Sequence, residues 1–197
     1  YKKKADLNED LQAFLETNFS DGKYDLYQAF ILRNLVLARR FGVVGMITMQ
    51  GWMFAPRYES IRSTLLSHST IRGMAQLGER AFDSIGGEVV TTTSFVLTNT
   101  SDPEFAGDFL RLTEGGNEFE KQNALLSAVK DINSPIRFSV SSSQFKKIPG
   151  DPLVYWASEE IRDLFRRIRP ISEFIITREG LTTGSNTIFL RGWHEVS

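Results

Sequence analysis

Few side chains in this sequence could carry out chemistry, and they are scattered along it. Only His68 and His194 are histidines, and there is no cysteine. These counts exclude a disulfide framework, a thiolate metal site and a histidine-rich metal cluster. Ser141–Ser143 is predicted to be a loop without the pattern of a nucleophile elbow, and no glycine-rich phosphate loop is present. Residue spacing alone therefore does not identify a reaction.

Three places are better candidates. Asp25 stands where a helix is predicted to begin, and capping that helix is its simplest role. Gly51–Phe54 follows a predicted strand, and α/β folds bind ligands at the carboxyl ends of parallel strands. Packing beneath the next helix is the simpler interpretation of these aromatic residues. Phe82 lies in a polar, glycine-rich loop, where its ring could stack on a base or anchor the loop to the core. From the residues alone, we favour the anchor.

The elements that must position these residues follow from hydrophobic periodicity. Helices are predicted at residues 7–19, 25–40, 57–67, 117–130 and 159–169, and strands at 43–48, 71–77, 88–97, 105–112, 136–140 and briefly around Phe145. The run 43–48 is continuously apolar after a helix and a glycine turn, which predicts a strand buried on both faces of a parallel sheet. Residues 105–112 are expected to form a hairpin with 88–97.

Composition sets the broad class. The chain has 197 residues, 41% hydrophobic and 24% charged, with a formal net charge of −1 that gives no electrostatic hint of nucleic acid. No apolar run reaches the length of a membrane span and no secretory signal is present, so a cytoplasmic protein without a membrane partner is expected. The stretch Glu114–Gly116 is the best linker, which predicts units at 1–114 and 115–197, the second incomplete at Ser197.

Five blocks of residues together resemble a known family, in that family's order and over nearly the whole chain. They lie within residues 25–33, 45–54, 77–97, 145–150 and 180–195. This pattern resembles the adenine-specific DNA methyltransferases of the gamma arrangement, and most closely the PglX-type enzymes of BREX phage-defence systems. The resemblance implies an α/β fold: the C-terminal half of a Rossmann-like, S-adenosylmethionine-dependent methyltransferase domain, followed by the start of a target-recognition region.

The resemblance also implies an enzyme and its site. Such an enzyme transfers a methyl group from S-adenosylmethionine to the exocyclic amino group of an adenine flipped out of double-stranded DNA. Phe82 matches the aromatic residue that packs against the flipped base, which changes its expected role from anchor to base platform. Asp25, Leu26 and Tyr27 match the segment that helps to close the cofactor's adenine pocket. The residues matching the start of the target-recognition region, and so expected to approach DNA, are Thr183, Gly184, Asn186 and Arg191.

The departures from the family pattern are equally specific. The cofactor's glycine-rich loop and the Asn-Pro-Pro of the catalytic motif are missing from the sequence, which opens on Tyr1 without a methionine. The offset from Tyr1 to Asn8 matches that between the catalytic tyrosine and the next helix. We therefore expect an inactive fragment that begins with the last residue of the catalytic motif.

Two other functions remain open on the sequence. One is a DNA-binding or specificity module without catalysis, and the other is a methyltransferase that acts on RNA or protein. A cofactor loop upstream in the parent gene would favour the enzyme, and the match of the downstream block to DNA enzymes argues against RNA or protein. Other phage-defence proteins are further candidate partners.

Overall fold

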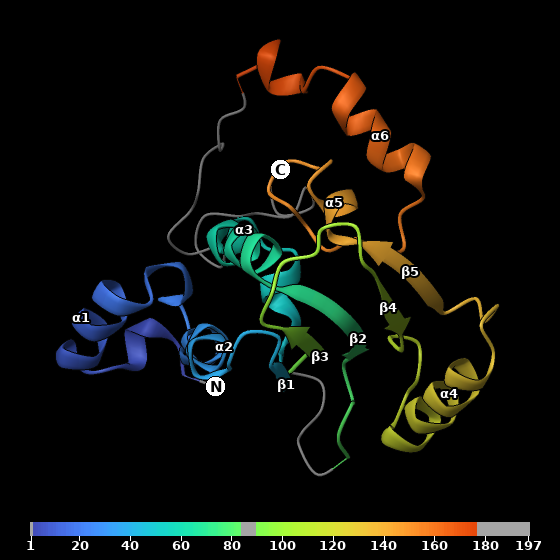
Figure 1. Ribbon diagram of the computed structural model, residues 1–197, viewed down its shortest axis with the longest axis horizontal. Coiled ribbons are helices and arrows are strands. Elements are labelled where there is room, and N and C mark those ends of the chain that lie inside the picture. The colour runs from blue at the N-terminus through green and yellow to red at the C-terminus, as the bar shows by residue number, and fades with distance from the viewer. Residues whose placement is uncertain (1, 84–89, 177–197) are drawn as a thin grey trace, which may run out of the picture. The chain divides into compact units, whose positions relative to one another are not determined.

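The protein is described from a computed structural model, which covers residues 2–83 and 90–176 (Figure 1). Contacts along the chain divide it into two compact units, residues 1–166 and 167–197. The first unit holds the sheet and most of the helices. In the second unit, the described residues include one short 3-10 helix, Ile171–Glu173. Among the described helices, none is long and apolar enough to cross a membrane.

Two helices open the first unit. α1 (Glu9–Asn18) begins at Asn8, whose side chain accepts a hydrogen bond from the Leu11 N–H at 2.9 Å. α2 (Leu26–Leu37) begins at Asp25, as the sequence predicts. Asn and Asp favour these positions because their side chains satisfy backbone donors that a helix leaves free. The two helices share a small apolar cluster, to which Leu15 and Ala29 contribute buried side chains.

The sheet has five strands in the order β1-β3-β2-β4-β5. Their bounds are β1 Val43–Met49, β2 Thr70–Gly78, β3 Thr92–Thr98, β4 Ala106–Arg111 and β5 Arg137–Ser141. β3 lies between β1 and β2 and is antiparallel to both, so β1 and β2 run parallel to each other. α3 (Glu59–His68) connects them and packs on β2, which makes β1-α3-β2 a crossover unit (Figure 1). The predicted α/β fold with a parallel element is thus confirmed.

The predicted hairpin between β3 and β4 is wrong. β4 pairs in parallel with β2 and antiparallel with β5. Both edges of β3 are already occupied by β1 and β2, so β4 cannot pair with β3 and extends the sheet at the edge of β2. Gly107 fits this pairing closely, since a Cβ atom there would lie 2.3 Å from the Ile71 carbonyl oxygen.

The two faces of the sheet differ in how they are covered. One face carries the main core, in which Phe95, Leu97 and Phe109 are buried. The other face is open: Val43, Ile47 and Val96 are exposed by 66%, 53% and 39%. The prediction that β1 is buried on both faces is therefore wrong for this chain. The residues of β1 are mostly apolar, but other described residues cover only one face of this strand.

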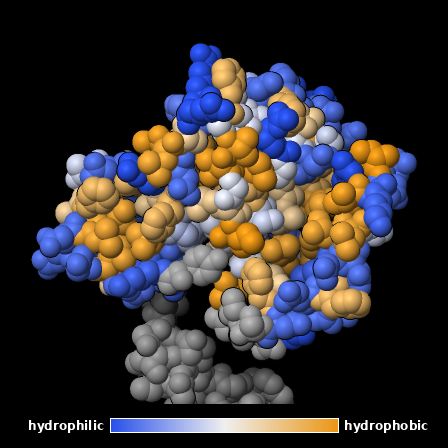
Figure 2. All heavy atoms as spheres, turned by 60° about the horizontal axis from the view of Figure 1, so that its bottom comes forward, coloured by the Kyte–Doolittle hydropathy of each residue, from blue (hydrophilic) through white to orange (hydrophobic). Residues whose placement is uncertain are grey.

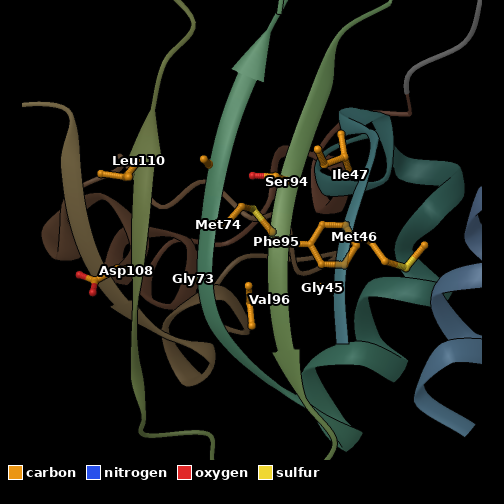
Figure 3. Close-up of a pocket in the computed structure, with 11 residues that line it drawn as sticks. Gly45, Met46, Ile47, Gly73, Met74, Ser94, Phe95, Val96, Asp108 and Leu110 are labelled. Carbon is orange, nitrogen blue, oxygen red and sulfur yellow. The ribbon is translucent and has the colours of Figure 1, made fainter. Parts of the chain in front are cut away.

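The open face contains a hollow of about 500 Å³ (Figure 3). Paired positions in neighbouring strands place a glycine on either side of Val96 there, since Gly45 is opposite Val96 and Val96 is opposite Gly73. Space-filling views show further hydrophobic surface, including a patch over α1 and α2 to which Phe14 and Phe30 contribute (Figure 2, left).

The remaining elements follow β4. They are α4 (Glu118–Lys130), α5 (Ser142–Phe145) and α6 (Glu159–Arg167). Asn117 caps α4 by accepting a hydrogen bond from the Glu120 N–H, as predicted. Two local predictions are wrong, because Phe145 ends a short helix and is not in a strand, and Ser141–Ser143 spans the end of β5 and the start of α5. Further 3-10 turns occupy Lys4–Asp6, Ser20–Gly22, Gln50–Met53 and Pro56–Tyr58.

Candidate functional site

The segment that leaves the carboxyl end of β2 carries Phe82. Gly78 has φ +67° and Arg80 has φ +53°, so the chain turns sharply through two left-handed residues. Glycine suits the first of them, since a Cβ atom there would also lie 3.3 Å from Thr113. Ala81 is buried beside the turn, whereas the Phe82 ring is only half-buried. The backbone is thus anchored at the buried Ala81, directly before Phe82, while part of the Phe82 ring stays accessible.

The segment that leaves the carboxyl end of β1 behaves differently. Trp52 and Met53 are buried in the core, and the Trp52 ring meets Phe95 edge-on at 5.3 Å between centroids. The indole N–H of Trp52 donates to Thr48 Oγ1 at 3.2 Å. Phe54 is half-buried and packs edge-on against Trp156 at 5.4 Å. The simpler interpretation of Gly51–Phe54, packing within the fold, is confirmed for Trp52 and Met53.

A polar network lies near the same end of the sheet, and sequence analysis missed it. The buried Tyr155 hydroxyl donates to Gln76 Oε1 at 2.7 Å, and Gln76 Nε2 donates to Gln50 Oε1 at 3.1 Å. Burial raises the pKa of the Tyr155 phenol, so it stays a neutral donor. The Tyr155 ring also stacks on Phe109 at 4.9 Å. This network fixes the strand ends from which both candidate segments emerge.

Arg62 was also missed. Its side chain is 1% exposed and donates to three carbonyl oxygens, those of Trp52 (3.0 Å), Ala55 (2.8 Å) and Gly150 (2.9 Å from Nε). Burial lowers the pKa of the guanidinium, while Glu59 and Asp151 act in the opposite direction. The sequence does contain a signal for its burial, because Arg62 lies four residues before Leu66 and therefore on the apolar side of α3.

The predicted cofactor segment lies at the start of α2. Asp25 is 4% exposed and its Oδ1 accepts from the Tyr27 N–H at 3.3 Å, which confirms its capping role. Burial raises the pKa of the Asp25 carboxyl, and hydrogen bonds from backbone N–H groups oppose that shift. Lys2 lies alongside, since its carbonyl oxygen accepts from the Leu26 N–H at 3.0 Å. Tyr27 is packed in the main core and its phenol pKa is raised by burial.

The predicted site residues therefore fall into separate groups. Asp25, Leu26 and Tyr27 lie together at the start of α2, whereas Phe82 lies on the segment after β2. The other predicted site residues lie outside the described residues: Tyr1, Thr183, Gly184, Asn186 and Arg191. His68 is exposed at the end of α3, as expected. In residues 2–83 and 90–176, no three histidine or acidic side chains are grouped to hold a metal ion.

Comparisons with known proteins agree with this fold. Residues 1–82 match the family model described as "Eco57I restriction-modification methylase". The adenine-specific methyltransferase PglX of Lacticaseibacillus casei (strain Zhang) is 37% identical over 94% of this chain. The adenine-specific methyltransferase BrxX of Escherichia coli O9:H4 (strain HS) is 37% identical over 97% of it. Over nearly its whole length, the chain is similar to PglX-type adenine-specific methyltransferases.

The chain spans only part of these PglX-type relatives, 16% of the first and 15% of the second. A solved structure supports the fold: the methyltransferase subunit of a type I restriction-modification system from Streptococcus thermophilus has a TM-score of 0.53 at 16% identity. That similarity covers 73% of this chain and 34% of the solved one. The family-model match includes Asp25–Tyr27 and ends at Phe82, so the two described candidate groups of this chain both lie within it.

Proposed function

We propose that this chain belongs to a site-specific DNA adenine methyltransferase of a phage-defence or restriction-modification system. The whole enzyme transfers a methyl group from S-adenosylmethionine to the exocyclic amino group of a flipped adenine. The similarity to PglX-type relatives over nearly the whole chain and the match to a restriction-modification methylase support this proposal. Double-stranded DNA is the partner that a restriction-modification methylase requires.

The observation that carries the proposal is the placement of Phe82. A half-exposed aromatic ring stands five residues beyond Leu77, close to the carboxyl end of a strand that belongs to a parallel pair. Ligands of α/β folds bind at such strand ends, and an aromatic ring there offers a flat surface to a base. We assign Phe82 the role of base platform. Tyr1, which directly precedes the residues that run beside Asp25 and Leu26, is the proposed catalytic aromatic residue.

S-adenosylmethionine is the proposed methyl donor, and the start of α2 is compatible with one wall of its adenine pocket. The Asp25 carboxyl is fixed by the Tyr27 N–H, and the Tyr27 ring is held in the core. These residues would supply a rigid boundary to the bound adenine moiety. The half-buried Leu26 is the side chain of the three with surface left for a ligand.

Residues 115–197 are proposed to connect the catalytic domain to target recognition. α4 and β5, which begin this stretch, lie within the first compact unit, whereas residues from Arg167 form the second. The proposed DNA contacts are all in the second unit: Thr183, Gly184, Asn186 and Arg191.

The test is Phe82→Ala in the full-length enzyme. Since stacking of one base on an aromatic ring is worth about 1–3 kcal/mol, methylation should fall roughly 5- to 150-fold. Affinity for S-adenosylmethionine, measured by calorimetry, should stay the same. Phe41→Ala, at an exposed phenylalanine in the turn before β1, is the matched control and should leave both quantities unchanged. Equal losses of methylation and cofactor affinity in Phe82→Ala would show that Phe82 is a fold residue.

A further inference from the structure

α4 holds both ends of the segment that carries Phe82. We call residues 77–83 the Phe82 segment. At its start, the Lys121 ammonium donates to the Leu77 carbonyl oxygen at 2.7 Å. At its end, the backbone N–H of Glu118 donates to Asp83 Oδ1 at 3.2 Å. Lys121 and Glu118 lie on the same turn of α4, so a single rigid element fixes both ends of the segment.

The first of these two attachments is a buried lysine. Lys121 is 4% exposed, and its ammonium also donates to the Leu112 carbonyl oxygen at 2.7 Å, just beyond β4. The lysine therefore joins α4 to the ends of two neighbouring strands. Burial lowers the pKa of the Lys121 ammonium, and Glu114 and Glu120 act in the opposite direction. A Cβ atom at Gly115 would lie 2.7 Å from Lys121 Cγ, so the lysine stem also fits closely against the linker.

The second attachment is reciprocal. The Asp83 N–H donates back to Glu118 Oε2 at 3.4 Å, so the two residues exchange a pair of hydrogen bonds across 35 positions of sequence. Glu118 is the first residue of α4, where the backbone N–H has no partner inside the helix. Asn117 satisfies the Glu120 N–H in the same turn. Asp83 thus adds a second cap to that of Asn117 by accepting from the Glu118 N–H, and its charge is favourable at the helix N-terminus.

We infer that Asp83 is a positioning residue for base binding, because its bond to α4 sets where the adjacent Phe82 ring lies. This inference rests on the proposed function of Phe82 as the platform for a flipped adenine. Phe82 is the direct neighbour of Asp83 in this segment, so the position of the Asp83 backbone constrains the position of the Phe82 ring. A ring that is already in place when the base arrives costs less conformational entropy on stacking, and the bonds to α4 provide that placement.

The experiment uses the full-length enzyme with two DNA duplexes. One carries 2-aminopurine at the target position and reports base flipping by a rise in fluorescence, and the other carries the target adenine and is used to measure kcat. Asp83→Ala should reduce the flipped fraction and kcat about 2- to 10-fold, the range expected for one lost hydrogen bond. Asp83→Asn keeps an acceptor oxygen and should restore most of both. Asp131→Ala is the matched control, because that exposed aspartate accepts from the Asn133 N–H at 2.9 Å at the other end of α4. It should leave flipping and kcat unchanged.

The Asp83→Ala, Phe82→Ala double mutant tests the role of Asp83 separately from the role of Phe82. If Asp83 acts through Phe82, then Asp83→Ala should have no further effect on flipping in a Phe82→Ala background. Equal effects of Asp83→Ala in both backgrounds, or an equal loss of S-adenosylmethionine affinity, would overturn the inference and leave the role of Phe82 intact. No effect of Phe82→Ala alone would overturn the proposed function, and the inference with it.

Discussion

The guanidinium of Arg62 donates to the carbonyl oxygen of Gly150, which lies 88 residues later in the chain. Gly150 has φ +81° and the following Asp151 has φ +52°, so this carbonyl is presented by a sharp left-handed turn. Through Trp52 and Ala55, the same side chain also holds the segment after β1. Arg62 therefore joins the turn at Gly150 to the segment that follows β1.

Replacing Arg62 should destabilise the fold. Arg62→Ala would remove the donor to the Trp52 and Gly150 carbonyl oxygens, whereas the Ala55 oxygen would keep its bond from the Tyr58 N–H, and buried groups that lose a partner cost about 1–3 kcal/mol each before relaxation. We expect the free energy of unfolding to fall by about 3 kcal/mol in urea titrations of the chain. Arg39→Ala, at an exposed arginine, should change it by less than about 0.5 kcal/mol. Similar values for the two variants would contradict the anchoring role.

The Tyr155 hydroxyl should contribute measurably to stability. Tyr155→Phe keeps the ring that stacks on Phe109 but removes the donor to Gln76. Loss of this buried hydrogen bond should lower the free energy of unfolding by about 1–2 kcal/mol. Tyr24→Phe removes the same atom from a side chain that is 41% exposed and serves as the comparison. Chemical denaturation of both variants tests the idea, which fails if Tyr24→Phe is the more damaging change.

Alkaline pH should weaken the fold through two buried phenols. Burial raises the pKa of Tyr27 and Tyr155 in the folded chain above the value of about 10 that a free tyrosine has. The unfolded chain therefore loses these protons first, so stability is intact below about pH 10 and falls as the pH rises beyond it. Tyrosinate absorbance should show both phenols ionising only as the chain unfolds. If both phenols titrated while circular dichroism still reported a folded protein, the conclusion that Tyr27 and Tyr155 are buried would be wrong.

Gly78 should tolerate no side chain. Its left-handed backbone and the close approach of Thr113 predict that Gly78→Ala costs about 1–2 kcal/mol of folding free energy. Gly45→Ala is the comparison, since a Cβ atom there meets nothing within 4 Å. That change should be neutral or stabilise by roughly 0.5 kcal/mol, because it restricts the unfolded chain. The melting temperature should fall for Gly78→Ala and stay the same or rise for Gly45→Ala, and equal falls in both variants would refute the assigned strain.

Local features were the ones that the sequence predicted well. Asp25 and Asn117 could be assigned as helix caps because a cap depends on residues within one turn. The continuous apolar run of β1 correctly indicated a strand next to a helix. The order of strands was out of reach, since the partner of β4 depends on which sheet edges remain free. Phe145 was placed in a strand because a four-residue helix is too short to show a period.

In the candidate site, too, residues with a local signal could be predicted and residues with distant partners could not. Phe82 could be proposed from the family pattern together with its glycine-rich surroundings. Arg62, Lys121 and Tyr155 could not, because each binds partners more than eight residues away that only the fold brings near. A buried charge on an otherwise apolar helix face is the signal to look for in such cases.

The open face of the sheet affects how the 197-residue chain should behave on its own. Among the described strands, β1 pairs only with β3, and its side chains Val43 and Ile47 are exposed. An apolar strand at a sheet edge is a template for pairing with other molecules. We therefore expect light scattering to show self-association that grows with protein concentration. The double substitution Val43→Lys and Ile47→Lys should restore a monomer. The solubility of the chain would then depend on the face of the sheet that also forms the hollow.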